Sequence, residues 1–222
     1  MHDSPAVRSL LTTSSDGRRA RGDRSRNAVL DHAVQVASVH GLSGLSFGRL
    51  ALSSPVNKSG IAGLFGSKEG LQLATVERAR DVFVTTVIEP SRTAERGLPR
   101  LWALVSGWLA YSRDRVFVGG CFFQTAAAEL DAAPPGPLRD AVAAAVTDWR
   151  DHIARQIAAA VELGHLDADT DPVQLGFELR AYLELANLES VLTGDARVYE
   201  RAARAARAAL AHHGAPAVDL PL

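Results

Sequence analysis

The segment over residues 42–67 contains two very short helical stretches separated by a tight break. Ser46 is placed to cap the first stretch, and the residues at 53–55 (Ser-Ser-Pro) end it. Asn57 is placed to cap the second stretch, which covers residues 58–65. Helices of about two turns are unstable alone and must pack on neighbouring helices. The pattern therefore predicts a helix-turn-helix unit near the start of the chain.

Longer helical patterns lie on both sides of this unit. Before it, residues recur on one helical face: Val29, Ala33, Val36, Ala37 and His40. Gly41 follows as a C-cap residue. After the unit, Ser67 is placed to cap a helix that has Glu69 in its first turn and runs to Ile88 before Pro90. We expect these two helices to supply the packing surface for the short ones.

The remainder of the chain is also helical in pattern. Apolar residues keep helical spacing over residues 101–109 and 142–161, on either side of a Pro-Pro-Gly-Pro loop at 134–137. A helix over residues 172–193 begins with proline and is apolar over much of its circumference, and a last helix covers about residues 195–212. No alternating strand pattern is present. The sequence predicts an all-α fold: an N-terminal three-helix helix-turn-helix domain and a C-terminal helical domain.

Composition fits an ordinary globular protein. The chain has 222 residues, of which 47% are hydrophobic and 22% are charged. Cys121 is the only cysteine, which excludes an internal disulfide framework and a cysteine-rich zinc site. The N-terminal segment has no signal-peptide pattern, and no apolar run is long enough to span a membrane. We expect a cytoplasmic protein.

Charge is distributed unevenly between the two ends. Residues 1–70 hold nine Lys/Arg and five Asp/Glu, a net +4, so the rest carries −5 of the total of −1. A basic head on an acidic body is typical of a protein whose head contacts phosphate, although scattered surface charge also produces such a split. We expect residues 1–23 to form a disordered arm and the first helix to start at Arg24. The arginines around it either touch the DNA backbone or are simply solvated: Arg18, Arg19, Arg21, Arg24 and Arg26.

Three motifs carry a resemblance to a known family. Leu-Ser-Gly-Leu-Ser-Phe-Gly-Arg-Leu-Ala at 42–51 is followed by Val-Asn-Lys-Ser-Gly-Ile at 56–61 and by Leu-Phe-Gly-Ser-Lys-Glu-Gly-Leu-Gln-Leu at 64–73. Over about residues 24–80 the chain resembles the DNA-binding domain of the TetR family of transcription regulators. Beyond residue 80 the resemblance is architectural. It implies a DNA-binding domain over 24–70, a ligand-binding and dimerisation domain over 71–213, and a flexible tail over 214–222.

The resemblance and the helix caps together suggest which residues meet DNA. The amides at a helix N-terminus favour phosphate, and the first residues of a recognition helix reach the bases. The resemblance implies phosphate contact by the lysine that opens the fourth helix. The candidate DNA-binding residues are Ser46, Arg49, Asn57, Lys58, Ser59 and Lys68. Each has a simpler interpretation as a helix cap or a solvated charge.

Several positions depart from the family pattern. Ser54 and Pro55 stand where the family usually has a large apolar residue and a glycine, so the turn is expected to be reshaped. Ala62 and Leu64 stand where the family usually has an aromatic residue and a histidine. Gly63 lies between them in the short recognition helix. These changes leave open an alternative function, a helical ligand- or partner-binding protein with a degenerate DNA-binding head.

The resemblance also implies a small-molecule pocket between the middle helices. Aromatic side chains suit a lipophilic effector, and the candidate ligand-binding residues are Trp102, Trp108, Tyr111, Phe122, Phe123, Trp149 and Tyr182. Aromatic residues at helical spacing are also ordinary core residues. Cys121 next to two phenylalanines is expected to be a buried small hydrophobic residue rather than a thiol sensor.

The expected partners are operator DNA, a small effector and a second copy of the chain. The helices at about 138–163 and 172–193 resemble the dimer bundle of the family, and the second is too apolar to be covered on one side only. The seven histidines show no metal-ligand spacing with acids, and no phosphate loop or nucleophile motif is present. We therefore expect no enzyme activity, no catalytic or metal site and no cofactor. We expect a regulator, namely a repressor that its effector releases from DNA.

Overall fold

The computed structural model describes the backbone of residues 5–216 and the side chains of residues 22–216. Every regular element within that range is helical, which confirms the all-α class. The elements are α1 (Pro5–His40), α2 (Phe47–Ala51), α3 (Lys58–Phe65), α4 (Lys68–Phe83), a π-helical segment η1 (Val84–Ile88), α5 (Glu89–Ser91), α6 (Leu98–Arg113), α7 (Phe122–Leu130), α8 (Pro137–Glu162), α9 (Pro172–Thr193) and α10 (Arg197–His212).

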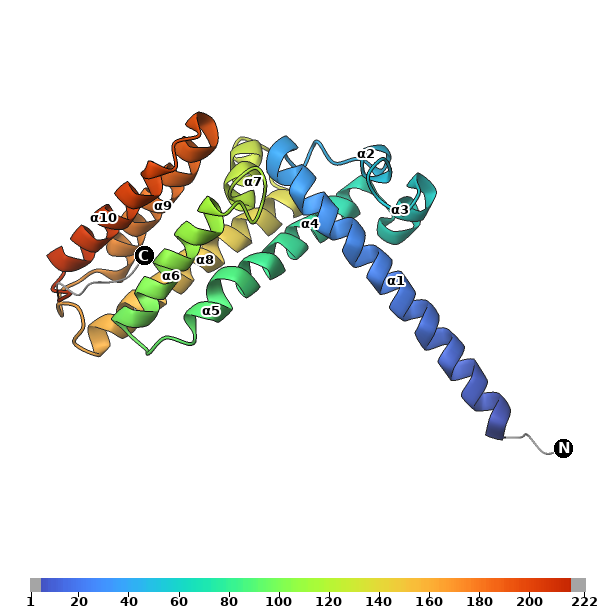
Figure 1. Cartoon of the computed structure of the whole chain (residues 1–222), viewed down its shortest axis with the longest axis horizontal. Helices are drawn as coiled ribbons and strands as arrows, with labels where there is room; N and C mark the ends of the chain where they lie inside the picture. Colours follow the sequence, from blue (N-terminus) through green and yellow to red (C-terminus); the bar gives the residue numbers. More distant parts are fainter. Residues whose placement is uncertain (1–4, 217–222) are drawn as a thin grey trace.

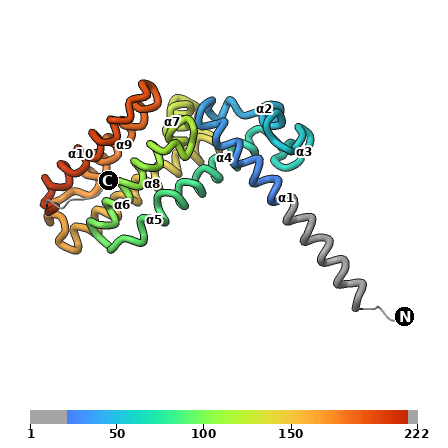
Figure 2. The backbone as a smooth tube through the Cα atoms, in the orientation of Figure 1, coloured from blue at the N-terminus to red at the C-terminus, as the bar shows by residue number. Residues whose placement is uncertain are grey.

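The helices form a small head and a larger body (Figure 1). The head consists of α2, α3 and the parts of α1 and α4 that pack on them, and the body consists of α6 to α10. Helix α4 starts in the head and ends in the body, where it packs on α8. Figure 2 shows its path as one continuous tube between the two parts. The two parts are therefore joined by a helix rather than by a flexible linker.

Local capping explains where the head helices begin. The side chain of Ser46 accepts a hydrogen bond from the Arg49 amide at 3.1 Å, and Asn57 accepts one from the Gly60 amide at 2.8 Å. Ser67 caps α4 in the same way, three residues before its bonded amide. Each cap satisfies one of the free amides at a helix start. The three predicted caps are confirmed.

The head also has its own apolar core. Leu45, Leu50 and Ile61 are completely buried, and Leu71 from α4 joins them. These residues hold the two short helices against α1 and α4, as the sequence predicts. Burial of several leucine-sized side chains, each contributing about 1.5–3 kcal/mol, offsets the weak intrinsic stability of two-turn helices.

The start of the first helix differs from the prediction. The sequence pattern places it at Arg24, whereas α1 begins at Pro5. Adding residues to a helix that has already formed costs little, because each one gains a backbone hydrogen bond. The backbone of residues 5–23 is thus helical where the sequence predicts a disordered arm. The side chains of residues 1–21 lie outside the described residues, so the DNA contacts of Arg18, Arg19 and Arg21 stay predictions. The same holds for the tail beyond residue 216.

Helix α4 continues directly into the π-helical segment η1, which has a wider turn. The predicted continuous helix to Ile88 is present, but Val84–Ile88 is π-helical. Pro90 lies two residues after this segment, and a proline lacks an amide hydrogen and crowds the carbonyl four residues before it, here that of Thr86. Thr85 and Thr86 also return hydrogen bonds from their hydroxyls to carbonyls of the preceding turn. We attribute the wider turn to these residues together; π-helical turns often occur at functional sites.

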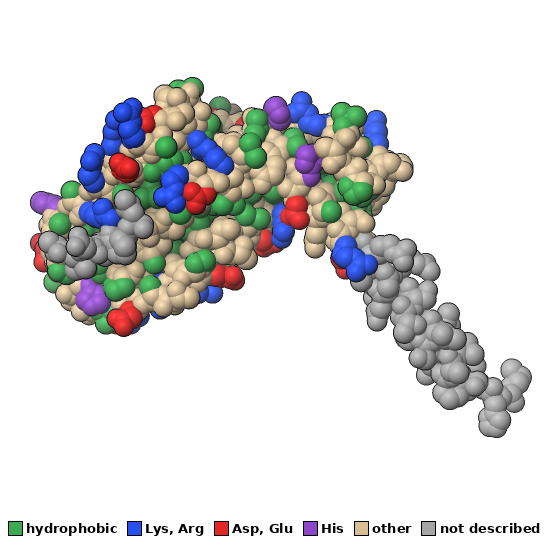
Figure 3. Space-filling model, in the orientation of Figure 1, with side chains coloured by type: hydrophobic (Ala, Val, Ile, Leu, Met, Phe, Trp, Pro, Cys, Tyr) green, Lys and Arg blue, Asp and Glu red, His purple; other side chains and the backbone are tan. Residues whose placement is uncertain are grey.

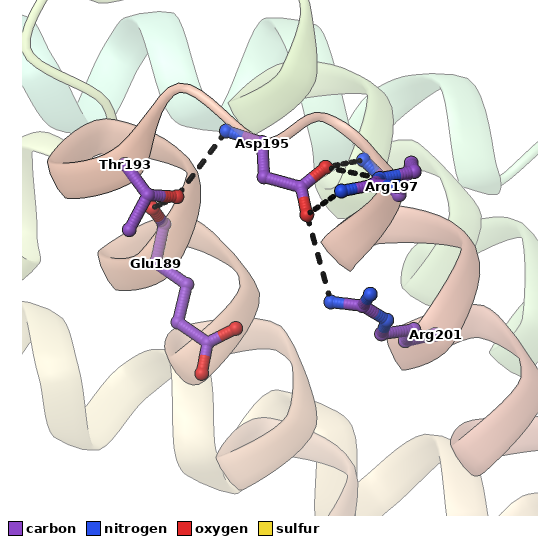
Figure 4. A network of polar contacts seen from close by, with 5 residues as sticks. All are labelled: Glu189, Thr193, Asp195, Arg197 and Arg201. Carbon is purple, nitrogen blue, oxygen red and sulfur yellow. Dashed lines mark hydrogen bonds and ion pairs between the residues drawn. The ribbon is translucent and has the colours of Figure 1, made fainter.

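The turn between α9 and α10 is held by a small polar network (Figure 4). Gly194 takes a left-handed conformation at φ 74°, which ends α9. The Asp195 carboxylate then accepts hydrogen bonds from the Arg197 amide at 3.0 Å and the Arg197 Nε at 2.8 Å, with Arg201 nearby. These partners, Arg197 first, lower the pKa of Asp195 to about 2. The positive charges of Arg197 and Arg201 on α10 are thus partly neutralised within the fold.

Positive charge is not confined to the head. In the view of Figure 3, Lys and Arg side chains lie over the α10 side of the body as well as over the head. None of the described helices combines the length and the apolar character that crossing a membrane requires.

Candidate functional site

Two cationic side chains of the head are free to meet an external partner. Arg49 on α2 and Lys58 at the start of α3 are exposed, and neither side chain has a hydrogen bond or ion pair within the described residues. Both stand next to helix N-termini, whose amides carry partial positive charge. The head thus offers two unneutralised cations where phosphate binding is favoured.

The other polar candidates of the head already have partners. Ser46 and Asn57 act as caps, and the Ser59 hydroxyl donates to the Asn57 side chain at 2.9 Å. The Lys68 ammonium group donates to the Ser43 carbonyl at 2.8 Å, which ties α4 to the turn before α2. A cap residue stays next to the exposed amides of its helix, so contact with phosphate is compatible with capping.

The side chain of Arg26 packs against another residue of the head and is not directed freely into solvent. Its guanidinium group lies 4.8 Å from the centre of the Phe65 ring at the end of α3. Such a cation–π contact stabilises the packing of α1 on α3. Among the predicted arginines, Arg26 therefore has a role in packing α1 against α3.

Gly63→Ala is expected to raise the free energy of unfolding by about 1 kcal/mol, because glycine costs that much relative to alanine inside a helix. A Cβ at Gly63 meets nothing within 4 Å, and the residue is exposed. Urea unfolding followed by circular dichroism measures the change.

Gly60→Ala is the matched control on the same helix. A Cβ there would lie 2.8 Å from Val56 Cγ1 and 3.2 Å from Asn57 Oδ1. We expect this substitution to give no gain, because the contact cancels the helix propensity. Equal stabilisation by both changes would contradict the described packing of α3.

The body contains a pocket of about 370 Å³ beside the end of α4. It is lined by residues of α4, η1, α6, α8 and α9 and, around the start of α7, by Cys121, Phe123, Gln124 and Ala127. The volume lies in the range of small-molecule sites, about 300–1,000 Å³. The pocket therefore joins the helix that leads to the head with four other helices of the body.

Three of the seven predicted aromatic residues line this pocket, namely Trp108, Phe123 and Trp149. A fourth aromatic residue, Phe83, joins them from the end of α4. The Phe83 ring makes edge contacts with Phe123 and Trp149 at centroid distances of 6.2 and 5.0 Å. Edge-to-face pairs of this kind are favourable beyond their buried area.

The other four predicted residues lie outside the lining. Trp102 packs under the guanidinium group of Arg207 from α10, at 4.9 Å. Tyr111 is buried behind Phe83, and Phe122 is buried against Phe117. Tyr182 is half-buried on α9. These residues belong to the core and its edges, because the faces that carry them turn towards other helices.

Charged side chains line the pocket beside the aromatic ones. Arg80 pairs with Asp148, and Arg180 pairs with Glu184 at 3.0 Å. Arg155 on α8 is exposed and has no hydrogen bond or ion pair within the described residues. The lining thus holds three guanidinium groups and two carboxylates.

Burial controls the protonation of the remaining groups. It raises the pKa of the Cys121 thiol and, with help from Cys121, the pKa of the Tyr111 hydroxyl. The thiol is therefore protonated near neutral pH and a poor nucleophile, in line with its interpretation as a buried small residue. Burial and the charges of Arg155 and Arg92 lower the pKa of His152, which keeps this imidazole neutral.

The sequence reasoning missed the polar part of the pocket because it searched for aromatic residues. A signal was available in the spacing: Trp149, His152 and Arg155 follow each other at three-residue intervals on α8. Residues at this spacing share a helix face. Arg180 and Glu184 show the related four-residue spacing on α9.

A polar clamp links α7 to the head. The Glu129 carboxylate accepts hydrogen bonds from the amides of Leu42 at 2.5 Å and Ser43 at 2.7 Å. Gln72 of α4 donates to the Leu42 carbonyl at 2.8 Å. The turn after α1 is therefore held from α4 and from α7, and both helices also line the pocket.

The comparison with protein families matches residues 97–206 to the model described as "Tetracyclin repressor-like, C-terminal domain". No curated protein matches the sequence at a significant level. A TetR transcriptional regulator from Chloroflexus aurantiacus J-10-FL is 24% identical with a TM-score of 0.77, covering 83% of this chain and 93% of that one.

Two further structures of the same fold were solved with ligands. AibR, in complex with isovaleryl coenzyme A and operator DNA, is 17% identical with a TM-score of 0.61, covering 81% of this chain and 94% of that one. A putative transcriptional regulator from Saccharomonospora viridis, in complex with choline, is 20% identical with a TM-score of 0.70, covering 86% and 97%. The matched C-terminal domain and the helix-turn-helix head together show that the chain belongs to the TetR family of transcriptional regulators.

Proposed function

We propose that the protein is a homodimeric repressor that a small lipophilic effector releases from its operator. The observation that carries this proposal is the path of α4. It begins at Lys68 beside the recognition helix and ends among the pocket residues Arg80 and Phe83. A ligand that displaces the end of this helix changes the position of the head. The solved relatives with isovaleryl coenzyme A and operator DNA, or with choline, support ligand-linked regulation as the general mode.

We assign the DNA-binding domain to residues 24–70 and the ligand-binding and dimerisation domain to residues 71–213. The boundary falls inside α4, so the two domains share a helix. A rigid shared helix transmits a displacement that a flexible linker would absorb. Such coupling is typically worth about 1–3 kcal/mol, or about fivefold to 150-fold in DNA affinity.

The proposed dimer interface is the outer face of α9. Large apolar side chains are exposed there along successive turns: Val173, Phe177, Leu185, Leu188 and Leu192. With 3.6 residues per turn they lie opposite Leu175, Leu179 and Leu183, which are buried in the body. A continuous exposed apolar face of this kind marks an interaction site. A two-fold axis beside α9 and its neighbour α8 covers both copies of this face at once.

The dimer also serves the reading of DNA. Two recognition helices related by a two-fold axis reach successive major grooves about 34 Å apart.

The hydrogen bonds of Glu129 to the turn after α1 offer a second route by which a ligand acts on the head. Helix α7 carries both this carboxylate and the pocket residues Phe123 and Gln124. Effector binding then acts on the head through α4 and α7 together.

Lys58→Ala is expected to weaken operator binding by about tenfold and to reduce the dependence of log affinity on log salt by about one unit, which corresponds to the loss of one phosphate contact. Fluorescence anisotropy measures both quantities with DNA from upstream of the gene, beside a scrambled duplex, at several salt concentrations. Arg113→Ala is the control: Arg113 is an exposed cation of the body. Equal effects of the two changes would argue against α3 as the reading helix.

The altered recognition helix favours one alternative, a regulator-like protein with a degenerate head. Ala62 and Leu64 replace the usual aromatic residue and histidine, and Gly63 weakens the helix. A working head gives specific binding at least about a thousandfold stronger than nonspecific binding. Absence of any preference for upstream DNA, followed by an empty genome-wide selection, would support the degenerate head instead.

A further inference from the structure

We propose that the pocket takes an amphipathic organic anion, with an apolar or aromatic body between the Trp108, Phe123 and Trp149 rings and a carboxylate or similar group facing Arg155. This inference rests on the proposed ligand-binding function and specifies the chemical class of the effector.

The apolar half of the pocket determines the character and the size of the uncharged part of the ligand. Phe83, Trp108, Phe123 and Trp149 come from four different helices and line one space. The volume of about 370 Å³ equals about twelve water volumes at about 30 Å³ each, so it suits a compact ring system or a medium alkyl chain. Apolar groups in such a space gain affinity from burial.

Among the described residues, the ion pairs within the pocket leave one guanidinium group, that of Arg155, without a counter-charge. Arg80 and Asp148 neutralise each other, as do Arg180 and Glu184. Arg155 keeps its full charge, and the lining carries a net positive charge while His152 is neutral. Arg92 adds positive charge at the same end, since it acts on His152 together with Arg155. A guanidinium group is suited to bind a carboxylate through two parallel hydrogen bonds.

A second observation also points to an oxygen-bearing ligand. The Nε of Arg180 is buried and has no hydrogen-bond partner within the described residues. A buried N–H donor without an acceptor is unfavourable, and a ligand oxygen on this side of the pocket would supply the acceptor. The carboxylates of Asp148 and Glu184 are already engaged, so an organic cation would find aromatic rings but no free carboxylate. The charges thus favour an anion over a cation.

The test compares ligands that differ only in their charged end. Phenylbutyl, naphthylmethyl and octyl groups, each ending in a carboxylate, a primary amide or a trimethylammonium group, are titrated into the full-length protein by isothermal calorimetry. We expect at least one carboxylate to bind about tenfold or more tightly than its amide and its ammonium counterpart, as one charge-assisted contact implies. Arg155→Gln is expected to remove this preference while leaving amide binding unchanged.

Arg150→Gln is the matched control, on the same helix but outside the lining and paired with Asp151. It should keep the preference for the carboxylate. Tighter binding of the ammonium compounds, or an unchanged preference in Arg155→Gln, would overturn the assignment of the ligand class and leave the sensing function standing. Binding of none of the compounds would overturn the pocket as a ligand site, and with it both the inference and the ligand-responsive part of the proposed function.

Discussion

Leu188→Asp is expected to convert the proposed dimer to monomers and to remove high-affinity operator binding. Leu188 is exposed in the C-terminal half of the apolar face of α9, with Phe177 and Leu185 on the same side. A two-fold interface buries the new carboxylate twice, and each unpaired buried charge is strongly unfavourable. A loss of about 3 kcal/mol would weaken dimerisation more than a hundredfold. Analytical ultracentrifugation over a range of protein concentrations measures the dissociation constant.

The matched control for this change is Val118→Asp. Val118 is exposed to a similar extent but lies in the turn between α6 and α7, where its amide donates a hydrogen bond to the side chain of Gln35 on α1. The control should dimerise and bind DNA as the unaltered protein does, and circular dichroism should show the same helix content for both variants. If Leu188→Asp remained dimeric at the concentrations where the unaltered protein is dimeric, the α9 face would not be the interface.

Phe83→Ala is expected to lower the free energy of unfolding by about 3–5 kcal/mol, the usual cost of removing a buried aromatic ring. Phe83 is buried at the end of α4 and makes edge contacts with Tyr111, Phe123 and Trp149. Its removal leaves a cavity that opens onto the pocket. Urea unfolding monitored by circular dichroism and by tryptophan fluorescence measures the loss.

Comparing Phe83→Leu with Phe83→Ala separates the free energy lost with packing volume from the free energy lost with the aromatic contacts. Leucine fills most of the same space, so we expect a clearly smaller loss than for alanine. Because Phe83 joins α4 to the pocket wall, the alanine variant should also show a weaker effect of any ligand on operator affinity. A loss below about 1 kcal/mol for alanine would contradict the described packing of the four rings.

The pocket in the body illustrates how far sequence reasoning reaches. Its aromatic character is predictable, and Trp108, Phe123 and Trp149 are in the lining. Trp102 and Trp108 belong to the same helix, yet Trp102 packs against Arg207 of α10 instead. A side chain's surroundings depend on which helix packs on its face, and helical spacing alone does not specify the neighbour.

The charges of the pocket depend even more on the tertiary structure. Arg80 and Asp148 are far apart in the chain and become partners only because α4 packs on α8. Among the residues that the structure describes, Arg155 is left without an ion-pair partner by the same packing of helices. No count of charges along the chain distinguishes an arginine with a partner from one without.

Local sequence signals specify where α2, α3 and α4 begin and where α1 ends. Ser46, Asn57 and Ser67 each bond to an amide three residues away, and Gly41 has the positive φ of a helix end, 72°. These interactions are local, so their partners are known once the sequence is known. The tertiary structure alone decided which aromatic and charged residues meet in the pocket and that the turn at Leu42 and Ser43 is held by Glu129 from α7. Such contacts join distant parts of the chain, and they form only when the helices have packed.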